Sequence, residues 1–118
     1  MKSYLYLEYM PNLAEALAAA QSAVQYAPHN PDSAYTLGLV LQRKGQFPEA
    51  ERAMQEALKV NPTYSDVYLS LGDLYAEDLK DTSKAIKAYQ RHLETGGMER
   101  RAKAYLEQHG ADASPVIQ

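Results

Sequence analysis

The stretch Tyr68-Leu69-Ser70-Leu71-Gly72-Asp73-Leu74-Tyr75 decides the fold, because its Leu-Gly pair occurs at the same place in an earlier stretch, residues 34–41. The two Leu-Gly pairs stand 34 residues apart. Four further pairs share this offset: Pro28 with Pro62, Leu13 with Phe47, Ala16 with Ala50, and Ala23 with Ala57. A fixed offset at several positions indicates an internal repeat, in which each copy is one supersecondary unit.

The apolar residues within a period have the spacing of amphipathic helices. They recur three or four positions apart, first at Ala34, Leu37 and Leu41 and then at Phe47, Ala50, Met54, Ala57 and Leu58. Between these runs, Lys44-Gly45-Gln46 contains a glycine typical of a helix C-terminus. Asn30-Pro31 and Asn61-Pro62 are expected to begin the next helix pairs, because asparagine caps helices and proline suits a first turn. Each period is therefore predicted to be a helix, a tight turn and a second helix, closed by a turn that contains proline.

The size of the side chains predicts how the helices pack. Two antiparallel helices should approach closely at the small residues Gly38, Gly72, Ala50 and Ala57, where a larger side chain would push the axes apart. Large residues should fill the spaces between successive hairpins: Met54, Tyr68, Leu71, Tyr75 and Tyr89. One hairpin cannot bury its apolar face alone, so neighbouring hairpins are expected to stack.

This pattern resembles the tetratricopeptide repeat (TPR) family, which has an aromatic residue, Leu-Gly and an aromatic residue on the first helix of each unit. An alanine, a large apolar residue and a small residue follow on the second helix, and a proline closes the unit. The middle unit matches at Leu37, Gly38, Ala50, Ala57 and Pro62, but has Ala34, Leu41 and Met54 where aromatic residues are usual. The third unit matches at Tyr68, Leu71, Gly72, Tyr75, Ala85 and Tyr89. The first unit matches only on its second helix, at Leu13, Ala16, Ala20, Ala23 and Pro28.

The resemblance implies an all-α fold, a right-handed α-solenoid of antiparallel helix pairs. Residues 1–110 would form a TPR domain with units at about 1–30, 31–64 and 65–97, a capping helix at 98–109 and a flexible tail at 111–118. The first unit is abbreviated. The third unit departs from the pattern by one extra residue, which we place in the turn between its helices. It also has Gly96-Gly97 in place of the closing proline, and His92 where the family prefers a small residue.

Composition narrows the classes of function. The chain has 118 residues, 46% hydrophobic and 23% charged, which is typical of a globular domain and not of a disordered or membrane-spanning chain. A net charge of −3 argues against a nucleic-acid partner. The absence of cysteine excludes a thiolate metal site and a cysteine nucleophile, and it leaves the compartment open, although we favour the cytoplasm.

No arrangement of residues predicts catalysis, a metal or another cofactor. His29, His92 and His109 stand in different units without ligand spacing. The acidic stretch 73–81 lacks the alternating carboxylates and central glycine of a calcium loop, so we interpret it as a helix surface that continues into a polar turn. Gly96-Gly97 belongs to no phosphate-binding motif and is expected to allow a sharp turn into the capping helix.

In TPR proteins the first helices of successive units line a concave surface that commonly holds a peptide. By that resemblance and helical spacing, the predicted peptide-binding residues are Tyr9, Tyr35, Thr36, Leu39, Gln42, Arg43, Asp66, Leu69, Ser70 and Asp73. The basic residues with which one family subset clamps a C-terminal carboxylate are missing here. We expect instead a ligand with one or two apolar anchors and a lysine or arginine that faces Asp66 and Asp73.

Two hypotheses for function remain open. The first is a non-catalytic module that binds a peptide or a partner protein in its concave face. The second is an oligomerising or structural piece of a longer TPR array or TPR-bearing enzyme. In that case Tyr4, Leu5, Tyr6 and Leu7, which border an unfinished end of the solenoid, would mediate self-association or domain swapping.

Overall fold

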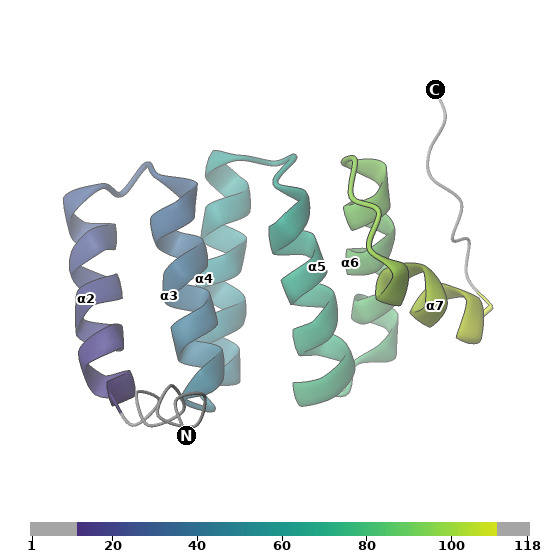
Figure 1. Cartoon of the computed structure of the whole chain (residues 1–118), viewed down its shortest axis with the longest axis horizontal. Helices are drawn as coiled ribbons and strands as arrows, with labels where there is room; N and C mark the ends of the chain where they lie inside the picture. Colours follow the sequence, from purple (N-terminus) through teal and green to yellow (C-terminus); the bar gives the residue numbers. More distant parts are fainter. Residues whose placement is uncertain (1–11, 111–118) are drawn as a thin grey trace, which may run out of the picture. The chain divides into compact units, whose positions relative to one another are not determined.

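The computed structural model describes residues 12–110, and this part of the chain consists of helices joined by turns, without a β-strand (Figure 1). It divides into two compact units at Val60 and Asn61. The first unit contains α2 (Leu13–Tyr26), α3 (Pro31–Arg43) and α4 (Phe47–Val60). The second contains α5 (Ser65–Asp73), the π-helical turn η2 (Leu74–Asp78), α6 (Thr82–Glu94) and α7 (Arg100–Gln108). The all-α expectation is confirmed.

In the first unit, α3 and α4 form a hairpin that closes on small residues, and α2 packs against α3. Ala50, Met54 and Ala57 are completely buried. A β-carbon added at Gly38 would lie 2.7 Å from Cγ of Met54 and 3.2 Å from the backbone oxygen of Ala50. The close approach of α3 and α4 that we predicted from their small residues is therefore present.

The turn of this hairpin depends on a glycine in the left-handed conformation. Gly45 has a φ of +83°, which suits glycine because it has no β-carbon. The backbone N–H of Gln46 donates to the oxygen of Leu41 at 2.9 Å, the long hydrogen bond that ends many α-helices. This ending lets α4 begin at Phe47, directly after the turn.

The second unit repeats the hairpin with α5 and α6 and adds α7. A β-carbon at Gly72 would lie 2.5 Å from Cε1 of Tyr89, so the tyrosine ring fills the place opposite the glycine. Figure 1 shows α7 beside α6, at a steep angle to the two helices of the hairpin. Ala102 and Leu106 of α7 are completely buried, which anchors the short helix on α6.

The two Asn-Pro pairs, predicted to begin helices in the same way, do so differently. Pro31 is the first residue of α3, and Oδ1 of Asn30 accepts a hydrogen bond from the N–H of Asp32 at 2.9 Å. The prediction for Asn61-Pro62 is wrong, because α5 begins only at Ser65. Oδ1 of Asn61 instead accepts from the N–H and the hydroxyl of Thr63, forming a local turn before the helix.

The extra residue of the third unit lies in the first helix and not in the turn between the helices. After Asp73 the helix continues as the wider π-helical turn η2. There the N–H of Leu79 donates to the oxygen of Leu74, five residues earlier, at 2.9 Å. A single π-helical turn accommodates one additional residue in a helix. Lys80 follows in the left-handed conformation, with a φ of 56°. With the inserted residue counted, Lys80 takes the position that Gly45 has in the first hairpin.

The repeat pattern describes α2 only in part. Ala20 is buried, whereas Ala16 and Ala23, which the pattern assigns to small packed positions, are exposed. The segment predicted to self-associate, Tyr4 to Leu7, lies outside the described residues, as does Tyr9 of the predicted peptide-binding set.

Candidate functional site

The α3 face that was predicted to bind a ligand presents one aromatic and one aliphatic side chain. Tyr35 and Leu39 are half-buried on this helix, and so is Gln42. Thr36 and Arg43 are exposed. The buried residues of α3, Ala34, Gly38 and Leu41, occupy a different side of the helix. The α3 face thus offers apolar area together with hydroxyl and amide groups.

The α5 face combines an exposed acid with half-buried residues. Val67, Leu71 and Gly72 form the buried side of this helix. Asp66 in the first turn is exposed, and Leu69, Ser70 and Asp73 are half-buried. The face has no basic residue, as the sequence predicted.

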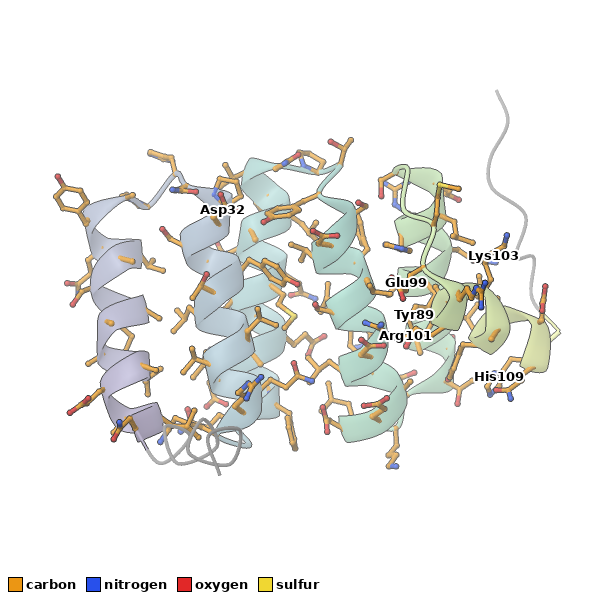
Figure 2. The ribbon with its side chains drawn as sticks, in the orientation of Figure 1. Asp32, Tyr89, Glu99, Arg101, Lys103 and His109 are labelled. Carbon is orange, nitrogen blue, oxygen red and sulfur yellow. The ribbon has the colours of Figure 1, made fainter. Side chains whose placement is uncertain are left out.

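The carboxylate of Asp73 accepts hydrogen bonds from side chains of α6 and α7. Oδ1 accepts a hydrogen bond of 2.5 Å from the hydroxyl of Tyr89. Arg101 donates from Nη2 to Oδ2 at 2.8 Å and from Nε to both oxygens at 3.2 Å. The side chain of Asp73 is 19% exposed and that of Arg101 is 53% exposed. Figure 2 shows Tyr89 and Arg101 where α7 meets the hairpin.

The surroundings of Tyr89 strongly favour its protonated hydroxyl. Burial raises the pKa of Tyr89 far above its ordinary value. The hydrogen bond to Asp73 and the negative charges of Asp73 and Glu77 raise the pKa further, while the positive charge of Arg101 lowers it slightly. The hydroxyl therefore serves as a donor that orients Asp73, and it is poorly suited to act as a base.

His92 is a structural residue that connects three helices of the second unit. Its side chain is 3% exposed, on α6. Nε2 accepts a hydrogen bond from the N–H of Glu99 at 3.3 Å, so the proton lies on Nδ1, which donates to the backbone oxygen of Ser65 at 2.8 Å. The interpretation of His92 as a packed residue, and not a ligand, agrees with this geometry.

The other two histidines are surface residues. His29 is exposed in the turn before α3. His109 is exposed after α7, where its ring stacks on Tyr105 with 4.2 Å between the ring centroids. Within residues 12–110, no group of three histidine or acidic side chains could hold a metal ion. In the same range, no helix is both long enough and apolar enough to cross a membrane.

Sequence reasoning identified Asp73 but missed its two partners. A signal for Tyr89 was present: it stands opposite Gly72 as Met54 stands opposite Gly38, and a hydroxyl at a buried position needs an acceptor. Arg101 had no comparable signal, because the repeat contains no equivalent of α7 from which its direction could be inferred.

Comparison with known proteins agrees with this architecture. Two family models, both described as tetratricopeptide repeat, match residues 35–104 and residues 12–56. The fold is similar to the crystal structure of the Sgt2 TPR domain from Aspergillus fumigatus, with a TM-score of 0.71 and 24% identity. That match covers 92% of this chain and 77% of the other. The repeated Leu-Gly hairpins and the matches to the family models together show that the chain belongs to the tetratricopeptide repeat family, whose domains are generally non-catalytic modules for protein–protein interaction.

Proposed function

We propose that this chain is a non-catalytic adaptor that binds a peptide or a partner protein through the α3 face and the α5 face. The observation that supports this most is the exposure pattern of the first helices. Both helices keep large apolar side chains, Tyr35, Leu39 and Leu69, only half-buried, at positions other than those of their buried residues. Large side chains that are partly exposed on rigid helices are good anchors, because little conformational freedom is lost on binding.

The charges of the two faces define the chemistry of the partner. The α3 face is suited to one or two apolar side chains, and the exposed Thr36 adds a hydroxyl for polar contacts. Asp66, exposed on the α5 face, favours a lysine or arginine in the bound segment. We therefore propose a partner that presents apolar side chains and a basic residue.

The decisive experiment compares two double variants that lose the same kinds of side chain from different places. Tyr35→Ala with Leu39→Ala removes the anchors of the α3 face. Tyr26→Ala with Val60→Ala, the control, removes a tyrosine and an aliphatic residue that are 92% and 41% exposed elsewhere in the first unit. Circular dichroism first checks that both variants are folded. They then serve as bait in a lysate of the source cells, beside the wild type. A partner lost only from the α3 variant supports the proposal.

Loss of the same partner from both variants, or capture only of further copies of this chain, would contradict the proposal. The second result would favour an oligomerising element instead. Once a partner is known, Asp66→Lys tests the electrostatic part. It should weaken binding at low salt and have less effect as salt rises, since an exposed charge acts through a screened interaction.

A further inference from the structure

The carboxylate of Asp73 lies on the α5 face, yet the chain itself already supplies a cation to it. Arg101 contacts both oxygens of Asp73, at 2.8 Å through Nη2 and at 3.2 Å through Nε. This arrangement of nitrogens against a carboxylate is the one that an arginine of a bound protein would make. At this position a side chain of α7 thus stands where a basic residue of the partner is expected.

The two groups that hold Asp73 differ in how easily they can leave. Tyr89 is 3% exposed and extends from the packed side of α6. The side chain of Arg101 is 53% exposed and extends from the first turn of α7. Its Nη1 also donates to Glu99 at 3.4 Å, and both of these ion pairs include the exposed guanidinium. An ion pair with so exposed a partner favours its closed form over its open form only about two- to fivefold. Arg101 can therefore swing into water while Tyr89 keeps Asp73 in place.

Departure of the Arg101 side chain does not require α7 to leave the hairpin. Ala102 and Leu106 are completely buried beside it in the same helix. The ring of Tyr105 also packs against the ring of Tyr89, with 5.0 Å between the centroids. These apolar contacts hold α7 whether or not the ion pair is closed.

We propose that Arg101 is a built-in competitor of the partner: its guanidinium holds the place on Asp73 that an arginine of the bound partner takes. The inference rests on the proposed function, since it concerns the same α5 face. An arginine can replace Arg101 without loss of contacts, whereas the point charge of a lysine cannot reproduce the two-nitrogen contact. The competitor lowers the affinity for every partner that uses Asp73 and selects those that present a guanidinium.

The first test needs no partner. The full chain with Arg101→Gln or Arg101→Ala is titrated with methylguanidinium, and the ¹³C carboxyl resonance of Asp73 is followed by NMR. Arg100→Gln, which removes the same charge from the neighbouring exposed residue, is the control. We expect half-saturation at a two- to fivefold lower concentration in both Arg101 variants than in the wild type and the control. Equal titrations in all four proteins, or an equal gain in the control, would overturn the inference.

The second test uses peptides of defined chemistry. Three pools of acetylated, amidated nonapeptides carry arginine, lysine or the neutral isostere citrulline at the central position, with mixed residues elsewhere. Arg101→Gln should bind the arginine pool two- to fivefold more tightly than the wild type and leave the citrulline pool unchanged. If the pools bind but Arg101→Gln does not raise the preference for arginine, the inference that Arg101 competes for Asp73 is wrong and the proposed function stands. If no pool binds any of the proteins, peptide binding is contradicted, and the methylguanidinium titration still decides whether Arg101 competes for Asp73.

Discussion

The α3–α4 hairpin and the α5–α6 hairpin have the same architecture but are held together by different chemistry. Gly38 faces the flexible side chain of Met54, whereas Gly72 faces the ring of Tyr89. The hydroxyl of Tyr89 continues into a hydrogen bond with Asp73, for which the methionine has no counterpart. At its glycine the first hairpin is thus closed by an apolar contact, and the second adds directed polar bonds that also position α7.

The two hairpins also differ in the residues that pack where each hairpin ends. With the inserted residue counted, His92 and Gly97 of the second hairpin stand in the positions of Ala57 and Pro62 in the first. A β-carbon at Gly97 would lie 2.1 Å from Cε1 of His92. The imidazole occupies the space that a side chain at 97 would need, so the two departures from the repeat depend on each other. A large polar side chain can thus replace the small residue of the repeat at position 92 because position 97 is a glycine.

Gly97→Ala should have the largest effect and should test this dependence directly. The new methyl group would overlap the His92 ring, which two hydrogen bonds hold in place, so we expect a loss of about 2–3 kcal/mol in the free energy of unfolding. Urea denaturation followed by circular dichroism measures it. In a His92→Ala background the same substitution should cost well under half as much. Equal costs in the two backgrounds would show that the pair is independent.

Tyr89→Phe should remove the polar bond that distinguishes the second hairpin. We expect a loss of about 1.5 kcal/mol at neutral pH, the usual value for a hydrogen bond to a charged acceptor. Because the pKa of Tyr89 is raised in the folded protein, its contribution is complete below about pH 10, the ordinary tyrosine value. Above that pH the unfolded chain loses the proton and the folded chain keeps it, so stability declines.

The difference between wild type and Tyr89→Phe should therefore shrink as pH rises from about 9 to 11. Urea denaturation at a series of pH values measures this change. Tyr105→Phe is the matched control, since Tyr105 packs on the same ring and belongs to α7. A constant difference between wild type and Tyr89→Phe over this range would contradict the raised pKa.

Substitution of the glycine that faces the second helix of each hairpin should change stability less. Comparing the substitution in the two hairpins isolates the contribution of the residue that the glycine faces. Alanine gains about 1 kcal/mol over glycine in a helix interior at either position, so this term cancels between Gly38→Ala and Gly72→Ala. The side chain of Met54 can rotate away from the new methyl group, whereas the planar ring of Tyr89 must move as a whole. We expect Gly72→Ala to be less stable than Gly38→Ala by about 1 kcal/mol. Equal midpoints in thermal denaturation would show that the ring adapts as easily as the methionine.

The fold could be predicted from sequence because its determinants are local and periodic. Gly38, Gly72 and Gly45 mark close approaches and a turn at positions that the repeat itself indicates. Where the second unit leaves the period, the prediction failed. One inserted residue gives no sign of whether a turn lengthens or a helix widens, because both leave the downstream register unchanged, and η2 takes the second course.

The candidate site could be predicted only as far as helical direction determines it. Spacing from Leu71-Gly72 assigns Asp66, Leu69 and Asp73 to the α5 face. It cannot show that Asp73 is bound by Arg101, because that contact joins residues 28 positions apart through a capping helix with no repeat equivalent. The ionic state of a face depends on such tertiary partners and not on the residues of the face alone.

Lys80→Gly should have the smallest effect, and its sign is the opposite of the others. In the first hairpin Gly45 provides the left-handed residue at no steric cost, whereas Lys80 adopts a φ of 56° with a β-carbon that opposes it. Replacing Lys80 by glycine relieves this strain, which stabilises the folded state. Glycine also makes the unfolded chain more flexible, which offsets part of that stabilisation. We expect a net stabilisation of about 0.5 kcal/mol, visible as a small rise in the midpoint of urea denaturation. Gly45→Lys is the reciprocal variant and should lose about 1 kcal/mol. If Lys80→Gly were destabilising, the lysine side chain would contribute more than its backbone conformation costs, and the two turns could not be treated as equivalent.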